Sequence, residues 1–475
     1  MDYLSDLYID GEWRSGAEGK TFPVIDPSDG TELAQFAIAT EADCVAAVDA
    51  ADRAAASWAA TAPRVRSEIL RKAFEILTAE REQFAEIIVR ENGKAFPDAL
   101  AEATYATEFF RWFAEEAVRI PGDFRLSPNG DKRIVVTHQP IGVSLLITPW
   151  NFPAAMATRK LGPALAAGCT TVLKPARETP LTAAYVVGVL DRAGLPAGVV
   201  NLVTPVPAGA AVTAMMKHPA VRKLSFTGST EVGRVLLEQA AATVINTSME
   251  LGGNAPFLVL PGADVDAAVE GALVAKMRNG GSACTAANRF YVHSSLHDEF
   301  ASKLEAGLAK FVVGPGIDRS NTLGSLVSVA ERDKVAELVT TAVGEGARVT
   351  LGGEPGDKGA FYPATVLVGV EHGSTINQTE IFGPVSALVV FDEVDEAVRM
   401  ANDTIYGLIA YVFGEPNEAF QVAQRIDAGM VAVNRGVISD PASPFGGMKQ
   451  SGLGREGGSE GILEFLETKY IGTAP

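Results

Sequence analysis

One cysteine of this chain has a type and a setting that could support chemistry. Cys284 stands in the stretch MRNGGSACTAANRF, residues 277–290, among small residues and between Arg278 and Arg289. A cysteine in such a place can be a buried packing residue, a metal ligand or a nucleophile. The stretch by itself leaves all three interpretations open.

Two further segments place a polar side chain directly after a strand-like run. In ITPWNFP, residues 147–153, Asn151 lies between two prolines that stiffen the turn, and an amide held rigidly can donate to a developing oxyanion. In MELGGNAP, residues 249–256, Glu250 precedes two glycines that admit close approach of another group. A partly buried glutamate can act as a general base, because desolvation raises its pKa. The alternatives are a turn-forming asparagine and a solvated carboxylate at a strand end.

A possible phosphate site lies in SFTGSTEVG, residues 225–233, where a strand ends in a glycine-bearing turn that opens a helix. Gly228 and Gly233 have the spacing of a P-loop, but Arg234 and Val235 stand where Lys-Ser/Thr is required. The segment therefore does not fit an ATP-hydrolysing P-loop. A tight strand-to-helix turn that binds nothing explains it equally well.

Metal catalysis has little support in the sequence. Of the five histidines, only His293 and His297 have the spacing of one helical face, and no His-Glu-x-x-His or cysteine-rich cluster accompanies them. We expect no metal site. A Cys–His hydrolase stays open on residue types alone, since any of the histidines could meet Cys284 in space.

Length, charge and cysteine usage limit the classes of function. The 475 residues exceed the size of a single hydrophobic core, so two or more domains are expected. The formal net charge of −18 disfavours binding to nucleic acid or to an anionic membrane, and an anionic substrate would need local positive charge. The three distant cysteines indicate no disulfide framework. With neither a signal peptide nor a membrane span in the pattern, we expect a cytoplasmic protein.

Helices and a hairpin are predicted in the first part of the chain. The helices are expected near 41–60, 64–92 and 98–119. Gly93 is the expected C-terminal cap of the second. Residues 124–140 are typical of a hairpin, because Asn129 and Gly130 form a strong turn signal between strand-like runs. This hairpin is too polar to be buried in the core of a monomer, so we expect an arm that extends towards a partner subunit.

From Gly142 onward, short apolar runs alternate with helices. These helices are expected near 154–167, 180–193, 208–217 and 230–241. The alternation indicates a parallel sheet with right-handed crossovers, the architecture of nucleotide-binding domains. A second α/β stretch covers about 252–436, and the tail contains the strand-like segment LEFLETKYI, residues 463–471.

Seven motifs in one order along the chain together resemble a known family. They are ITPWNFP, LKPARETP, FTGSTEVG, MELGGNAP, the Cys284 segment, EIFGPV and PFGGMKQSGLGREGG. The series is similar to the aldehyde dehydrogenase superfamily over essentially the whole length. The resemblance implies an α/β fold with two Rossmann-like parallel-sheet domains and an arm made of the β-hairpin and the C-terminal strand. It implies 1–122 and 142–251 as the dinucleotide-binding domain, 252–436 as the catalytic domain, and 123–141 with 437–475 as the arm of a homodimer or homotetramer.

The resemblance also implies a role for each candidate in aldehyde oxidation. Cys284 would attack the aldehyde carbon, and the oxyanion of the thiohemiacetal would be held by the Asn151 amide and the Cys284 backbone N–H. After hydride transfer, Glu250 would activate the water that hydrolyses the thioester. The residues implied in cofactor binding are Trp150, Lys174, Arg177, Gly228, Ser229, Leu251, Glu380 and Phe382. Ser282 departs from the pattern, since many members have Gln there.

Substrate and cofactor choice rest on a smaller set of positions. Arg159, Arg278 and Ser439 match the carboxylate-binding residues of the branch of the superfamily that oxidises succinate semialdehyde. Glutarate semialdehyde or another short aldehyde is an alternative substrate, a structural ion pair is the alternative role for each arginine, and a cofactor-free cysteine esterase is the alternative from another class. Arg177 stands where NAD-preferring relatives often have Glu, so we expect NADP⁺ to be preferred and NAD⁺ to be weaker.

Overall fold

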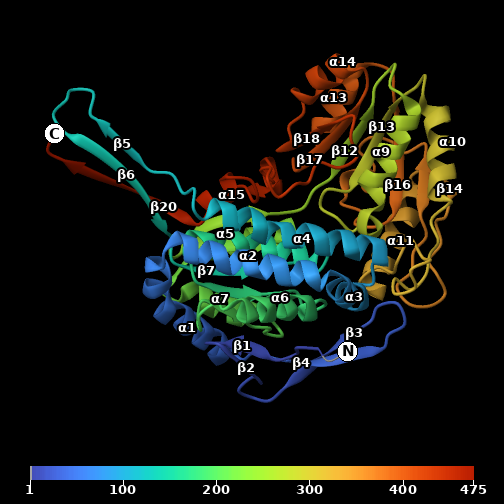
Figure 1. Cartoon of the computed structure of the whole chain (residues 1–475). Coiled ribbons are helices and arrows are strands. Elements are labelled where there is room, and N and C mark those ends of the chain that lie inside the picture. Colours follow the sequence, from blue (N-terminus) through green and yellow to red (C-terminus); the bar gives the residue numbers. More distant parts are fainter. Residues whose placement is uncertain (1–2) are drawn as a thin grey trace.

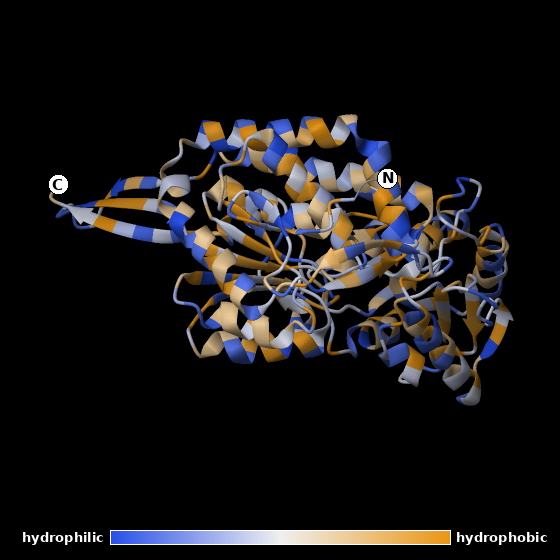
Figure 2. Ribbon diagram, turned by 90° about the horizontal axis from the view of Figure 1, so that it is seen from below, coloured by the Kyte–Doolittle hydropathy of each residue, from blue (hydrophilic) through white to orange (hydrophobic). Residues whose placement is uncertain are grey.

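Two open sheets, each covered by helices on both faces, make up the body of the molecule, and a three-stranded arm projects from it (Figure 1). The computed structural model describes residues 3–475. Apolar residues gather on the central strands, whereas the outer helices alternate between hydrophobic and hydrophilic positions (Figure 2). The architecture confirms the predicted α/β fold class with two parallel-sheet domains.

The first sheet has eight strands in the order β19-β11-β10-β7-β8-β9-β1-β2, and its five central strands are parallel. The bounds are β1 (Leu7–Ile9), β2 (Glu12–Arg14), β7 (Val143–Ile147), β8 (Thr171–Lys174), β9 (Val200–Leu202), β10 (Val221–Thr227), β11 (Asn246–Glu250) and β19 (Gly452–Leu453). The chain runs from β7 through β8 to β9 and then returns to β10 on the other side of β7. The carboxyl ends of β7 and β10 therefore flank a topological switch point, where open α/β sheets bind their ligands.

Alternation along the central strands explains why helices cover both faces of this sheet. Leu146 and Leu173 belong to a core shared with α2 to α6, whereas Leu145 and Val172 belong to a second core shared with α1, α7 and α8. The bounds are α1 (Glu41–Ala60), α2 (Pro63–Ala79), α3 (Arg81–Asn92), α4 (Phe96–Glu116), α5 (Pro153–Ala167), α6 (Pro180–Ala193), α7 (Gly209–Lys217) and α8 (Thr230–Ala241).

The helix predicted over 64–92 is two helices in the structure. Glu80 separates α2 from α3, because its backbone (φ −100°, ψ 16°) leaves the helical region. Its carboxylate turns instead towards Arg192 and Tyr185 of α6. The predicted cap at Gly93 is confirmed, since this residue ends α3 at φ 89°.

The second sheet has seven strands in the order β14-β15-β16-β13-β12-β17-β18, all parallel except for β14. Helices α9 and α10 cover one face, and α11 to α14 cover the other. The strands are β12 (Ala255–Val259), β13 (Ala287–His293), β14 (Arg348–Leu351), β15 (Thr365–Val368), β16 (Val385–Phe391), β17 (Ile409–Phe413) and β18 (Met430–Val433). The helices are α9 (Val265–Met277), α10 (His297–Leu308), α11 (Val329–Gly344), α12 (Thr375–Gln378), α13 (Val394–Asn402) and α14 (Pro416–Ala423).

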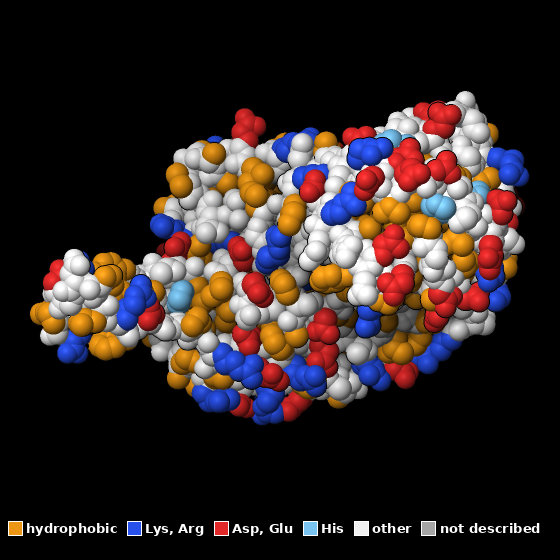
Figure 3. Space-filling view, turned by 90° about the horizontal axis from the view of Figure 1, so that it is seen from above, with side chains coloured by type: hydrophobic (Ala, Val, Ile, Leu, Met, Phe, Trp, Pro, Cys, Tyr) orange, Lys and Arg blue, Asp and Glu red, His pale blue; other side chains and the backbone are white. Residues whose placement is uncertain are grey.

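The arm consists of the predicted hairpin and the last strand of the chain. Strands β5 (Asp123–Leu126) and β6 (Arg133–Pro140) form the hairpin, and β20 (Leu466–Thr473) pairs antiparallel along the whole of β6. Large hydrophobic side chains are exposed on the arm (Figure 3). Phe124 and Tyr470 are among the exposed residues. A surface of this kind suits the predicted contact with a partner subunit.

The segment 437–475 is not all arm, which corrects the predicted boundary. Strand β19 joins the first sheet beside β11, and Ile462 of α15 (Glu460–Leu463) and Phe465 are buried in the core of the first domain. Only β20 extends into the arm. A separate hairpin, β3 (Thr21–Ile25) and β4 (Glu32–Ala37), was not predicted. Among residues 3–475, no helix combines the length and apolar character needed to cross a membrane.

Candidate active site

A cavity of about 430 Å³ opens at the switch point of the first sheet and extends to the second domain. It brings together residues from the carboxyl ends of β7, β8, β10 and β11 with loops of the second domain. The predicted residues that line it are Trp150, Asn151, Lys174, Arg177, Gly228, Ser229, Leu251, Cys284, Glu380 and Phe382. Ten predicted residues from distant parts of the sequence therefore share one cavity.

The loop that carries Cys284 has an unusual backbone. Asn279, Gly280 and Gly281 have consecutive positive φ angles of 52°, 56° and 77°, a region that glycine and asparagine tolerate best. A Cβ at Gly281 would lie 2.2 Å from the carbonyl oxygen of Gly383. The small residues before the cysteine are thus required by the turn and by the close approach of the neighbouring chain.

Cys284 is the accessible cysteine of the three. Its side chain is partly exposed to the cavity, whereas Cys44 and Cys169 are buried. Burial among protein groups raises the pKa of the Cys284 thiol to about 12, although the nearby Arg159 and Arg278 oppose the rise. The resting group is therefore a neutral thiol that must lose its proton before it can act as a nucleophile.

Asn151 lies between the end of β7 and the start of α5, and its side chain reaches the Cys284 loop. The buried amide donates one N–H to the carbonyl oxygen of Ser282 at 3.1 Å. Its second N–H has no acceptor within residues 3–475, so it is free for a group in the cavity. Ser282, at the position where the family pattern often has Gln, donates its hydroxyl to the carbonyl oxygen of Phe382 at 3.3 Å.

Glu250 ends β11 beside this cavity without lining it. Its side chain is buried, and neither carboxylate oxygen has a hydrogen-bond partner among the described residues. Burial, reinforced by the negative charge of Glu456, raises the pKa of Glu250 well above its usual value. The glycines after it do admit close approach, because a Cβ at Gly253 would lie 2.5 Å from the carbonyl oxygen of Cys284.

On the β8 side of the cavity, two cations stand without a partner. Within residues 3–475, neither Lys174 nor Arg177 has a carboxylate at ion-pair distance, and burial lowers the pKa of Lys174. Arg177 is exposed and lies over the Phe22 ring at 5.8 Å; it does not pair with its neighbour Glu178. Both side chains are therefore available to an anionic or hydroxyl-bearing ligand.

The opposite wall is built by the turn after β10 and by a loop of the second domain. Ser229 caps α8, with its hydroxyl accepting from the N–H of Val232, so the first N–H groups of this helix lie at the cavity. Glu380 accepts from the N–H of Gly253 at 3.1 Å, and burial raises its pKa to about 7. Phe382, at φ 57°, packs edge-on against Trp150.

The two arginines predicted to bind substrate differ in their partners. Arg159 is buried on α5, where its Nε lies 2.7 Å from a carboxylate oxygen of Glu456, and Lys160 lies 2.6 Å from the other oxygen. Arg278 is partly exposed, lies over the Phe152 ring at 5.8 Å, and has no carboxylate at ion-pair distance among the described residues. Within residues 3–475, no hydrogen bond joins the side chain of Ser439 to that of Arg159 or Arg278.

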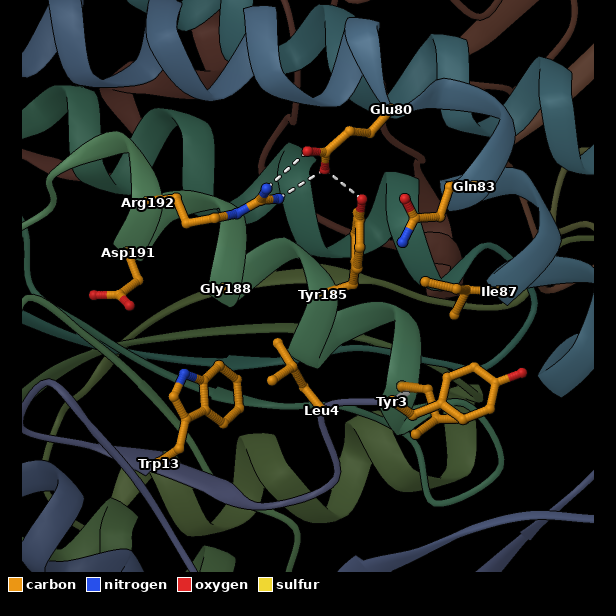
Figure 4. Close-up of a pocket in the computed structure, with 11 residues that line it drawn as sticks. Tyr3, Leu4, Trp13, Glu80, Gln83, Ile87, Tyr185, Gly188, Asp191 and Arg192 are labelled. Atoms are coloured by element: carbon orange, nitrogen blue, oxygen red, sulfur yellow. Dashed lines mark hydrogen bonds and ion pairs between the residues drawn. The ribbon is translucent and has the colours of Figure 1, made fainter. Parts of the chain in front are cut away.

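A second cavity, of about 320 Å³, lies between the N-terminal segment and helices α3 and α6 (Figure 4). Its main charges are already paired, since Glu80 accepts two hydrogen bonds from Arg192 at 2.7 Å and one from Tyr185. It contains no cysteine, and within residues 3–475 no cluster of His, Cys, Asp and Glu could hold a metal ion. The arrangement that can do covalent chemistry is the one at Cys284.

Comparison with known proteins agrees with this geometry. The sequence profile of the "Aldehyde dehydrogenase family" matches residues 13–471. The chain belongs to the aldehyde dehydrogenase family. It is 51% identical to a succinate-semialdehyde dehydrogenase of Paenarthrobacter nicotinovorans over 93% of this chain and 99% of that protein. It is 45% identical to a glutarate-semialdehyde dehydrogenase of Pseudomonas putida over 99% of this chain and 98% of that protein.

The solved structures give the same result for the fold. A crystal structure of an Escherichia coli NADP-dependent enzyme superposes with a TM-score of 0.98 and 44% identity, covering 100% of this chain and 98% of that one. As an aldehyde dehydrogenase, the protein is an oxidoreductase that uses NAD(P)⁺. The predicted family, fold and enzyme class are therefore confirmed.

Several residues of this aldehyde dehydrogenase site were not found by sequence reasoning. Met156, Val232, Glu331 and Lys334 also line the cavity, and Glu456 neutralises Arg159. Glu456 lies in the motif LGREGG, which carried the resemblance without suggesting a role. For Glu331 and Lys334, on the first turns of α11, the sequence has no signal that distinguishes them from an ordinary solvated helix face.

Proposed function

We propose that this aldehyde dehydrogenase oxidises succinate semialdehyde to succinate and reduces NADP⁺ in preference to NAD⁺. The observation that carries the proposal is the meeting of Cys284, a free N–H of Asn151 and unpaired cations in a single cavity at the switch point. We expect the enzyme to be cytoplasmic. We also expect it to form a homodimer or homotetramer through the arm.

The residues that line the cavity support the binding of a dinucleotide. Lys174 and Arg177 would hold the adenosine ribose and a 2′-phosphate, and the N-terminus of α8 at Gly228 and Ser229 would face the pyrophosphate. Glu380 would accept hydrogen bonds from the nicotinamide ribose. When bound, the nicotinamide ring accepts the hydride that leaves the substrate carbon.

Cys284 would begin the reaction as a thiolate that attacks the aldehyde carbon. Because burial keeps the thiol protonated, the thiol must first lose its proton to solvent in the cavity. The second N–H of Asn151 and the backbone N–H of Cys284 would donate to the oxyanion. After hydride loss leaves a thioester, Glu250 would activate a water to release the acid.

Recognition of the substrate carboxylate falls mainly to Arg278, since Arg159 already shares its charge with Glu456. Arg159 would add a positive field, and Ser439 a hydroxyl. A succinate-semialdehyde dehydrogenase and a glutarate-semialdehyde dehydrogenase among the relatives support a carboxylated aldehyde. Glutarate semialdehyde stays the second candidate, because one methylene contributes only about 1–3 kcal/mol of discrimination.

The test is steady-state formation of reduced nicotinamide, followed by its near-ultraviolet absorbance. Succinate semialdehyde, glutarate semialdehyde and butanal are each compared with NADP⁺ and with NAD⁺. The highest kcat/KM is expected for succinate semialdehyde with NADP⁺. A higher value for butanal would overturn the carboxylate assignment. No reduction of either cofactor with any aldehyde, together with hydrolysis of an ester in the absence of cofactor, would favour the esterase alternative.

A further inference from the structure

The main chain of the loop that carries Asn151 is held by unusually buried donors. The amide of Asn92 donates to the carbonyl oxygen of Trp150 at 2.9 Å. Lys94, fully buried and paired with Glu102, donates from Nζ to the carbonyl oxygen of Asn151 at 2.8 Å. These donors come from the end of α3 and the turn before α4, so they fix the loop within its own domain.

Asn279 adds a donor from the other domain. Its buried Nδ2 donates to the carbonyl oxygen of Asn151 at 2.7 Å and to that of Ser282 at 3.1 Å. The Ser282 carbonyl is also the acceptor of the Asn151 amide. One side-chain amide thus bridges the loop after β7 and the loop before Cys284, and it uses both of its hydrogens in doing so.

The backbone of Asn279 is arranged so that this bridge can form. Its φ of 52° turns the chain sharply, and its own N–H donates to the carboxylate of Asp98 at 3.1 Å. Asparagine tolerates this conformation, but the conformation does not require asparagine, because glycine adopts it at no steric cost. The amide side chain therefore has a purpose that the turn alone does not explain.

We propose that Asn279 is a positioning residue that sets the distance between the Asn151 amide and the Cys284 sulfur across the domain boundary. The inference rests on the proposed function, in which Asn151 holds the oxyanion. Misplacing a donor by about an ångström can cost a hundredfold in rate, so a buried bridge at this point has a direct kinetic consequence.

Asn279→Gly is the decisive variant, because it keeps the positive φ and the N–H to Asp98 and removes only the amide. We expect kcat to fall roughly tenfold to a hundredfold while the KM for cofactor changes less than about twofold. The matched control is Asn201→Ala. Asn201 is another buried asparagine whose amide bridges two carbonyl oxygens, those of Thr171 and Gly198, far from the site. Asn201→Ala should keep the wild-type kcat, although its melting temperature should fall about as much as that of Asn279→Gly.

A double-mutant cycle with Asn151→Ala separates positioning from general structural support. If Asn279 acts through the Asn151 amide, Asn279→Gly should have almost no further effect on kcat in the Asn151→Ala background. Additive losses, or an unchanged kcat in Asn279→Gly alone, would overturn the inference and leave the proposed function intact. A wild-type kcat in Asn151→Ala would overturn both.

Should Asn279→Gly fail to fold, Asn279→Asp replaces it in the same cycle. Aspartate also tolerates positive φ, and it puts an acceptor where the two carbonyl oxygens need a donor. The same dependence on Asn151 is expected, and additivity in that cycle would equally reject the inference.

Discussion

The two sides of Cys284 differ in how much of their charge is already neutralised. On the cofactor side, Lys174 and Arg177 have no carboxylate partner within residues 3–475. On the other side, Arg159 is buried against Glu456, and only Arg278 stands without such a partner. A cation can take a ligand's anion at little cost only if it is not already paired, because breaking a buried ion pair is strongly unfavourable.

The difference separates ligand-binding residues from structural ones of the same type. Arg159 and Arg278 match the same family pattern, yet the ion pair of Arg159 also joins α5 to the segment that carries Glu456. We therefore expect Arg159 to act in the fold and in the local field, and Arg278 to be the arginine that contacts substrate. The predictions below test this contrast.

The largest effect is expected at the two arginines. Arg278→Ala should lower kcat/KM for succinate semialdehyde by roughly tenfold to a hundredfold and leave butanal nearly unchanged, since a hydrogen bond to a charged group contributes about 1.5–3 kcal/mol. Arg159→Ala should lower the melting temperature and the kcat/KM for both aldehydes, because it leaves Glu456 with only Lys160 as a partner. Steady-state kinetics and thermal unfolding measure both. If both variants lost the preference for succinate semialdehyde over butanal to the same extent, the proposed difference between the two arginines would be wrong.

A smaller effect is expected on the cofactor side. Arg177→Glu should raise the KM for NADP⁺ by about tenfold and change the KM for NAD⁺ little, because a carboxylate repels the 2′-phosphate that the guanidinium attracts. The control is Arg192→Glu, which lies at the second cavity and not at this one. If wild-type enzyme has the higher kcat/KM with NAD⁺, the cofactor assignment fails and the aldehyde chemistry is unaffected.

The smallest effect concerns the titration of the thiol. Because burial raises the pKa of Cys284 to about 12, the thiolate fraction should keep growing as pH rises, so alkylation by iodoacetamide in cofactor-free enzyme should accelerate up to pH about 10 without levelling off. Arg278→Ala should slow alkylation further, since that arginine lowers the pKa. Peptide mass spectrometry at Cys284 follows the rate. A plateau near pH 8.5 would mean an unperturbed thiol.

The sequence predicted the elements that carry the site because their signals are local. Gly93 was recognised as a cap, Asn129 and Gly130 as a turn, and the run from Gly142 as alternating strands and helices. The break at Glu80 was missed because its cause is tertiary: the carboxylate is held by Arg192 and Tyr185, far along the chain. The destination of β19 was missed for a similar reason, since its partner β11 is also distant.

The candidate site, like the fold, could be predicted only in part from the sequence. Motifs in family order placed Cys284, Asn151 and Glu250 near one another, and the structure brings them to one end of the first sheet. The pairing of Arg159 with Glu456 could not be predicted, because nothing in either motif shows that the two side chains meet. The sequence contains a partial signal for Asn279, because an Asn-Gly pair favours positive φ. It contains no signal for the two carbonyl oxygens that accept from the Asn279 amide.

The central claim, that Cys284 forms a covalent intermediate which Glu250 resolves, is tested most directly by trapping that intermediate. Glu250→Gln enzyme is mixed with succinate semialdehyde and NADP⁺ and examined by intact-protein and peptide mass spectrometry. We predict a stoichiometric burst of reduced cofactor and an acyl group attached to Cys284, because the thioester forms but water is not activated. Cys284→Ala should show neither. Reduced cofactor made by Cys284→Ala, or a burst with no adduct on Cys284, would contradict the account.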